Sequence, residues 1–158
     1  MSRLAAQSLP ESLSRLLDGS ELERKVGTVL ELVTLDEHGW PHVALLSVGE
    51  VLAVSPSELR LALWASSGTS ANLRRTGRGL LAVVHDGAYL KVRFSAEPLP
   101  AIAAGERTLT AFAAQVAEVD ADRVGYATLT GGIGFELDEP GPVLERWRDV
   151  VEDLRACG

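Results

Sequence analysis

The sequence predicts a mainly β fold of the α+β class, in which six or seven antiparallel strands form a small barrel with helices at both ends of the chain. Three observations support this prediction. Between residues 27 and 119, β-branched and leucine-rich runs alternate with turn residues at the spacing of short strands. Several of these runs have one apolar and one polar face. Closing the strands into a barrel would bury the apolar faces and leave no unpaired edge. A helical apolar stripe follows Pro142.

The strands are expected to pair as hairpins. The first strand ends in a turn over residues 36–39, and Pro41 begins the strand that returns antiparallel to it. Pro56-Ser57 marks a second hairpin. Asp86-Gly87 marks a third, and it is the strongest turn signal because glycine adopts a positive φ at no steric cost. The expected strands cover residues 28–35, 41–48, 51–55, 58–64, 80–85 and 88–96, with a seventh within 107–119.

Helices are expected in three places. Over residues 8–25, Ser8 with Glu11 and Ser20 with Glu23 have the spacing of capping boxes, and Gly19 between them is typical of a left-handed helix end. A short helix over 70–76 interrupts the strands. The third helix covers 142–156, and its apolar stripe consists of Val143, Leu144, Trp147, Val150, Val151 and Leu154.

Composition limits the class of protein. A chain of 158 residues, 46% of them hydrophobic, is expected to form one domain, with a helical N-terminus (8–25), a barrel (26–137) and a C-terminal helix (142–156). The net charge of -7 argues against nucleic-acid binding. The single cysteine, Cys157, allows no intrachain disulfide, and no stretch resembles a signal peptide or a membrane span. We therefore expect a cytoplasmic protein without membrane or nucleic-acid partners.

The most unusual local composition lies where the strand ending at Trp64 passes through a hydroxyl-rich loop into the short helix. Amides at a helix N-terminus carry partial positive charge, hydroxyl groups add donors, and Gly68 lets the backbone approach a phosphate closely. Residues 64–75 therefore favour an anion-binding loop. The alternative is that Ser67 or Thr69 only caps the helix and that the arginines at 74, 75 and 78 are solvated.

Other side chains could complete such a site. Lys91 and Arg93 share one face of a strand and could supply positive charge, although alternating basic residues commonly face solvent. Trp40 and Trp64 could stack on a planar ring, or they could belong to the core.

Metal and nucleophile chemistry have little support. His38 and His42 have the i, i+4 spacing of metal ligands on a helix, but Gly39 and Pro41 between them prevent a helix there. The glycine-rich segment 130–134 lacks the lysine of a P-loop and the full dinucleotide fingerprint. There is no Gly-x-Ser-x-Gly elbow, and no catalytic side chain is assigned.

Three short motifs occur in a familiar order. Asp-Glu-His-Gly-Trp-Pro-His (36–42) precedes Leu-Ala-Leu-Trp (61–64), and Ser-Gly-Thr-Ser-Ala-Asn-Leu (67–73) leads to a strand at 80–84. This arrangement resembles the pyridoxamine 5′-phosphate oxidase-like, FMN-binding split β-barrel superfamily. The resemblance covers about residues 25–120, and the helical ends resemble a small bacterial subgroup with no assigned reaction.

The resemblance implies a split barrel that forms a homodimer, with two FMN sites at the interface. It places Ala44 where the oxidase pattern has an arginine and Thr69 where it has a lysine, and losing two cations weakens phosphate binding. Lys91 or Arg93 would then be the charge partners. Carried over position by position, the residues near the FMN phosphate are Leu63, Trp64, Ala65, Ser66, Ser67, Thr69, Ser70 and Asn72.

Three functions remain open from the sequence. The first is a flavin-dependent oxidoreductase acting on an unidentified small molecule, for which pyridoxamine-phosphate oxidation itself is disfavoured by the missing cations. The second is a non-catalytic ligand-binding or interaction homodimer that has lost the cofactor. The third keeps the fold but binds F420 or haem, with His42 or His85 as the candidate axial ligands for haem.

Overall fold

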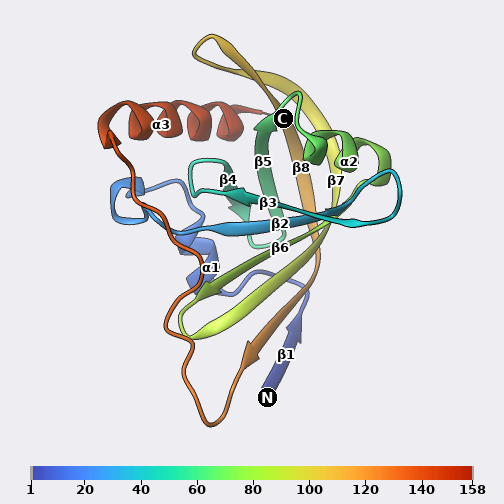
Figure 1. Cartoon of the computed structure of the whole chain (residues 1–158), viewed down its shortest axis with the longest axis vertical. Coiled ribbons are helices and arrows are strands. Elements are labelled where there is room, and N and C mark those ends of the chain that lie inside the picture. The colour runs from blue at the N-terminus through green and yellow to red at the C-terminus, as the bar shows by residue number, and fades with distance from the viewer. Residues whose placement is uncertain (1, 158) are drawn as a thin grey trace.

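The computed structural model describes residues 2–157, without the side chains of residues 2–5. Within this range, eight antiparallel strands form one curled sheet in the order β3-β2-β6-β7-β8-β5-β4, with β1 paired to β8 (Figure 1). The predicted mainly β split-barrel architecture is confirmed, with one strand more than expected. The strands are β1 (Ser2–Ala6), β2 (Leu30–Leu35), β3 (Pro41–Leu46), β4 (Val51–Ser55), β5 (Glu58–Trp64), β6 (Arg78–His85), β7 (Ala88–Ala104) and β8 (Arg107–Arg123).

The core lies inside the curl of this sheet. Because side chains alternate along a strand, every second residue points inward. Leu30 and Leu32 of β2 and Leu59 and Leu61 of β5 are fully buried, and Phe112 of β8 is the largest fully buried side chain among the described residues. The leucine face predicted for residues 59–63 is therefore the core face of β5.

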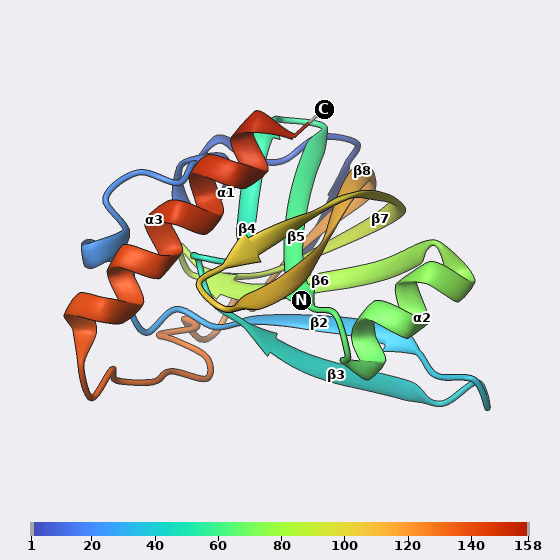
Figure 2. The ribbon, with the colours of Figure 1, turned by 90° about the horizontal axis from the view of Figure 1, so that it is seen from above.

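The ribbon formed by β7 and β8 is longer than the sequence predicts. Each strand has 17 residues, whereas the expected strand ended at residue 96. β6 pairs with β7 only as far as Ser95, so the rest of β7 pairs with β8 alone. Pro98 and Pro100 lie in this part, where an edge strand tolerates residues without an N–H group. Figure 2 shows the ribbon bending back towards α3 (Pro140–Ala156).

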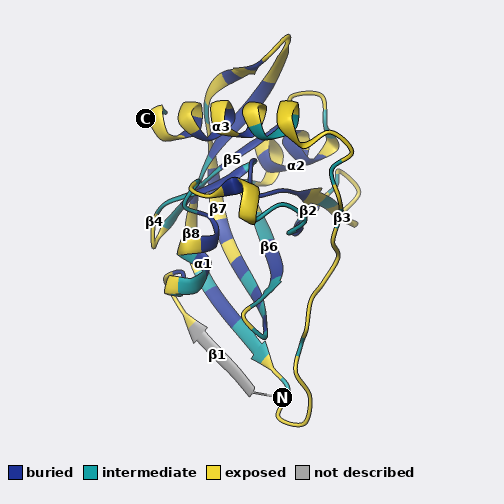
Figure 3. Cartoon of the chain, turned by 90° about the vertical axis from the view of Figure 1, so that its left-hand side faces the viewer, coloured by how far each residue is buried: buried dark blue, intermediate teal, exposed yellow. Residues whose placement is uncertain are grey.

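Helix α3 covers one side of the sheet, with its buried face inward and its exposed face outward (Figure 3). Gly49, in the turn between β3 and β4, allows this close packing, because a Cβ atom there would lie 2.0 Å from Cγ of Trp147. Neither α3 nor any other helix within residues 2–157 has the length and hydropathy of a membrane span. The predicted stripe is buried at Trp147, Val150, Val151 and Leu154 and half-buried at Val143 and Leu144.

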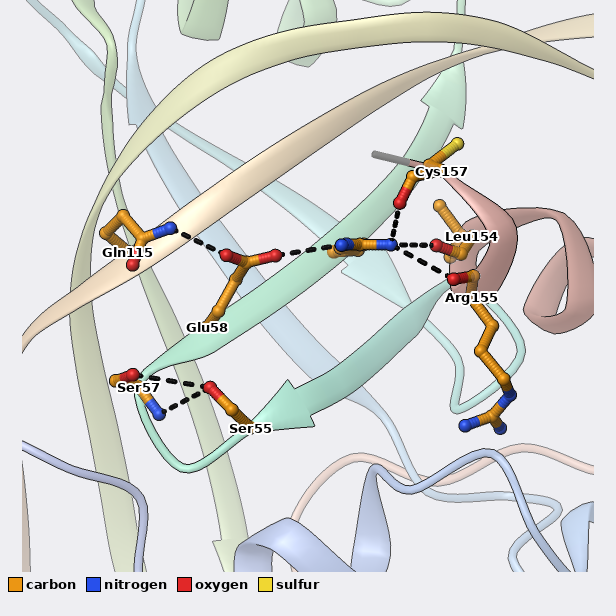
Figure 4. Close-up of polar contacts among 8 residues, drawn as sticks. Ser55, Ser57, Glu58, Gln115, Leu154, Arg155 and Cys157 are labelled. Atoms are coloured by element: carbon orange, nitrogen blue, oxygen red, sulfur yellow. Dashed lines mark hydrogen bonds and ion pairs between the residues drawn. The ribbon is translucent and has the colours of Figure 1, made fainter.

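The C-terminus of α3 is held by Arg60 of β5. Nη1 of Arg60 donates to the carbonyl oxygens of Leu154 at 2.7 Å and Arg155 at 3.3 Å, and also to that of Cys157 (Figure 4). Its Nε donates to Oε2 of Glu58 at 3.0 Å. The last carbonyls of a helix lack intrahelical partners, so this guanidinium satisfies them and complements the negative end of the helix dipole.

The N-terminal helices differ from the sequence prediction. α1 (Glu11–Leu16) has no side-chain N-cap, so the capping box predicted from Ser8 is wrong. The 3-10 helix η1 (Leu22–Arg24) also lacks one, because the hydroxyl of Ser20 donates to Oδ1 of Asp18 at 2.7 Å instead of capping a helix. The N-cap position of α1 is Pro10, two residues after Ser8, and that of η1 is Glu21, one residue after Ser20, so neither serine stands at the cap that its spacing predicts.

Candidate functional site

The predicted anion-binding loop joins β5 to α2 (Gly68–Thr76), which lies on the other side of the sheet from α3 (Figure 2). The helix begins two residues before the predicted start. Ser67 is its N-cap, with an extended backbone (φ -74°, ψ 151°), and its hydroxyl accepts the amide N–H of Ser70 at 3.1 Å. Gly77 ends the helix in the left-handed region (φ 68°), where glycine is favoured.

Most hydroxyl groups of this loop form hydrogen bonds within the loop. Oγ of Ser70 donates to the carbonyl oxygen of Trp64 at 2.7 Å, and Oγ of Ser67 lies 3.2 Å from Oγ of Ser70. Ser67 therefore has the capping role that the sequence left as an alternative, and Thr69 does not. Thr69 is buried and Ser66 is exposed.

The open donors of the loop are backbone amides. The amide of Ala71 donates to the carbonyl oxygen of Ser67 at 3.3 Å, and that of Ser70 is capped. The amides of Gly68 and Thr69 have no acceptor within residues 2–157. They lie at the positive end of the α2 dipole, which favours an anion.

His42 of β3 lies beside this helix end. A Cβ atom on Gly68 would lie 3.8 Å from Cε1 and 3.9 Å from Nε2 of the imidazole. The β2–β3 register pairs His42 with Thr34, and Nδ2 of Asn72 donates to Oγ1 of Thr34 at 3.0 Å. Asn72, one of the predicted site residues, thus fixes α2 against the hairpin. Sequence reasoning missed the place of His42, because the hairpin register alone does not show that α2 packs against this strand.

Trp64 comes directly before the loop, and it lines a cavity with Trp147 and Val150 of α3. Its side chain is 40% exposed, and the guanidinium carbon of Arg107 lies 4.6 Å from the centre of its ring, within range of a cation–π contact. Ala65 beside it is exposed, whereas Leu63 is part of the core. Arg107 is a cation beside this loop that the sequence analysis did not consider.

The structure does not bring Lys91 and Arg93 to this loop. Nζ of Lys91 is 2.5 Å from Oδ2 of Asp122, and Nη1 of Arg93 is 2.8 Å from Oε2 of Glu118, so both charges are neutralised on the sheet. Arg93 lines a groove with Thr76, at the opposite end of α2 from the open amides. Ala44 is half-buried on β3, two residues after His42.

The donor set around Gly68 fits a phosphoryl oxygen. It offers two N–H groups and an imidazole, whereas no group of three potential metal ligands occurs among residues 2–157. The two histidines considered for haem lie apart: His42 is beside α2, and His85 lines a groove with Lys25 and Asp86.

A curated relative matches almost the whole chain. The uncharacterized protein YclD of Bacillus subtilis is 38% identical over 147 residues, which cover 93% of this chain and 96% of YclD. No protein-family model matches the sequence.

Several solved structures share the fold. A putative pyridoxamine 5′-phosphate oxidase from Lactobacillus delbrueckii superposes with a TM-score of 0.58 at 19% identity, covering 75% of this chain and 98% of that one. An F420 reductase gives 0.51 at 15% identity, covering 70% and 98%. A pyridoxinephosphate oxidase family protein from Clostridium acetobutylicum, related to general stress protein 26, gives 0.51 at 17% identity, covering 78% and 94%.

Proposed function

Because the chain belongs to the family of YclD and has the split-barrel fold of the pyridoxamine 5′-phosphate oxidase-like superfamily, we propose that it binds FMN and acts as an oxidoreductase on a small molecule. The FMN phosphate would lie at the N-terminus of α2. The observation that supports this most directly is the pair of open amides at Gly68 and Thr69, next to the imidazole of His42.

The residues of the loop would have different roles. Gly68 and Thr69 would donate backbone N–H groups to the phosphate, and His42 would add a third donor when its ring nitrogen carries a proton. Trp64, which lines the cavity under α3 and contacts the guanidinium of Arg107, has no proposed role at the phosphate. Bound flavin would supply hydride transfer, and the chain would supply position and electrostatics.

An exposed apolar surface on the β2–β3 hairpin supports the proposal of a homodimer. Val43 and Leu45 of β3 are 53% and 56% exposed, and Leu35 of β2 is 48% exposed. β3 is also an edge strand, and exposed apolar edges usually mark an interaction surface. Leu45→Glu is expected to convert the dimer into a monomer, which size-exclusion chromatography with light scattering would detect. A wild-type chain that is already monomeric at all concentrations would contradict the dimer.

The phosphate contact separates this proposal from simple stacking on Trp64. Titration of the purified chain with FMN and with riboflavin, followed by flavin fluorescence, compares ligands that differ only in the phosphate. We expect FMN to bind at least roughly tenfold more tightly, since one charge-assisted hydrogen bond is worth about that much. Equal affinity for the two would exclude the α2 N-terminus as the phosphate site, and no uptake of either would exclude a flavoprotein.

A cofactor-free binding protein is the second candidate function. Ala44 and Thr69 provide no cation at the two positions where the oxidase pattern has one, and Lys91 and Arg93 are paired with acidic residues. F420 also carries a phosphate group, and one structural neighbour is an F420 reductase, so F420 belongs in the same titration. Haem has no phosphate. Its binding would instead be detected as a change in haem absorbance when His42 or His85 becomes its axial ligand.

A further inference from the structure

A separate cavity lies under α3. It has a volume of about 120 Å³ and is enclosed by the β3–β4 turn, the end of β5, the β7–β8 ribbon and α3. About 30 Å³ of liquid volume belongs to each water molecule, so the space suits a ligand of roughly the size of four waters. The walls that matter for recognition are formed by Glu50, Trp64, Leu109, Arg146, Trp147 and Val150.

Glu50 lines this cavity, and one of its two carboxylate oxygens has unused hydrogen-bonding capacity. Oε1 accepts the amide N–H of Ser47 at 2.9 Å and its hydroxyl at 2.7 Å. Oε2 has no hydrogen bond to any residue between 2 and 157, and the residue is half-buried. A carboxylate held in this way is oriented by Ser47 and retains a free acceptor for a ligand.

Arg146 of α3 is an exposed residue that also lines this cavity. Its charge acts on Glu50 electrostatically, yet the two groups form no ion pair within 4.0 Å. Opposite charges that share a small cavity without touching leave room for a molecule that carries both charges. A ligand with only a positive charge would face Arg146. A ligand with only a negative charge would face Glu50.

We propose that this cavity binds a small α-amino acid as its zwitterion. The ammonium group would donate to Oε2 of Glu50 and the carboxylate would pair with the guanidinium of Arg146. A short aliphatic side chain would contact Leu109 and Val150. This inference goes beyond the flavin proposal and does not depend on it, because all the proposed contacts come from protein side chains and none from a bound flavin.

Isothermal titration calorimetry on the full-length chain without added flavin tests the proposal. Glycine, L-alanine and L-valine are the probes, and ethylamine and propionate are the single-charge controls. We expect saturable binding of at least one of the three amino acids and no saturable binding of either control. Glu50→Gln and Arg146→Gln should each weaken that binding roughly tenfold or more.

Arg148→Gln is the matched control, because Arg148 lies on the same helix but pairs with Glu23 at 3.7 Å on the exposed surface. It should bind the amino acid as the wild type does. The amide introduced by Glu50→Gln keeps an oxygen that can accept both Ser47 hydrogen bonds, and circular dichroism would verify the fold. If Glu50→Gln does not fold, the amino-acid affinities of Arg146→Gln and Arg148→Gln are compared, and this comparison decides whether the proposal holds. Absence of saturable binding for all three amino acids, or wild-type affinity in Arg146→Gln, would overturn the proposal, whatever the FMN titration shows.

Discussion

The C-terminus of α3 and the N-terminus of α2 are both helix ends at the surface of the barrel, and they differ in what satisfies them. At α3, the guanidinium of Arg60 contacts three carbonyl oxygens at the end of the helix. At α2, the hydroxyl of Ser67 takes one amide, and those of Gly68 and Thr69 find no acceptor in the described chain. The chain therefore completes the first end by itself and leaves the second open to an external anion.

This difference separates stability from binding. A helix end that a side chain saturates contributes to the free energy of unfolding, whereas an open end beside His42 contributes only when a ligand arrives. Substitutions at the two ends should thus change different measurements.

Arg60→Met should have the largest effect. The variant leaves two carbonyl groups of α3 and that of the C-cap Cys157 without their donor, and it removes a partner of the half-buried Glu58, so the free energy of unfolding should fall by about 2 to 4 kcal/mol. Urea unfolding followed by circular dichroism measures it. Arg148→Met, at an exposed ion pair of the same helix, should cost less than about 1 kcal/mol. Equal costs for both variants would show that Arg60 does not hold the helix end.

Gly68→Pro should affect binding without affecting stability. Proline is favoured at the first position of a helix, and the extended backbone of Ser67 is the conformation that a residue before proline prefers. The substitution deletes one open amide, so FMN affinity should fall by about 1.5 to 3 kcal/mol while the urea midpoint stays the same or rises. Fluorescence titration and urea unfolding on one preparation measure both. Unchanged FMN affinity would show that this amide does not contact the phosphate.

Ser67→Ala should lower stability and leave FMN affinity nearly unchanged, which is the reverse of Gly68→Pro, and the expected change is smaller. Loss of the N-cap should lower the free energy of unfolding by about 1 kcal/mol. FMN affinity should change little, because the Ser67 hydroxyl is engaged with Ser70. A large loss of affinity in a folded variant would mean that the hydroxyl turns towards the phosphate.

Glu50→Gln should change the pH dependence of stability. Burial raises the pKa of Glu50 above its usual 4.5, against the lowering influence of hydrogen bonds from Ser47 and of the charge on Arg146. The unfolded chain then releases this proton first as pH rises through 4.5, so the contribution of Glu50 to stability falls with rising pH until the folded pKa is passed. The variant should gain stability relative to wild type between acidic and neutral pH, as urea midpoints would show. A difference that stays constant with pH would contradict the raised pKa.

Local signals in the sequence predicted the local elements well. The bounds of β5 follow from the alternation of its leucines, and the turn at Asp86-Gly87 has both residues at positive φ (53° and 74°), as the Asp-Gly signal predicts. The apolar stripe of α3 predicted its buried face. In each case neighbours within a few residues determine the conformation.

What the sequence could not predict depends on pairing between distant residues. β1 forms only because β8 extends far enough to pair with it, and the outer half of β7 tolerates two prolines because it has one neighbour. At the candidate site, the helix and its cap were predictable, but the place of His42 required the β2–β3 register and the packing of α2. Lys91 and Arg93 were predicted to share a face, but their partners on β8 were not visible locally.

The position of β8 in the sheet also determines when the fold can be completed. This strand pairs with β1, β5 and β7. Its partners therefore come from the beginning, the middle and the end of the part of the chain that forms the sheet. During synthesis, the core leucines of β5 must therefore wait about fifty residues for the strand that covers their free edge, as in other proteins of high contact order. Slow refolding is the expected consequence.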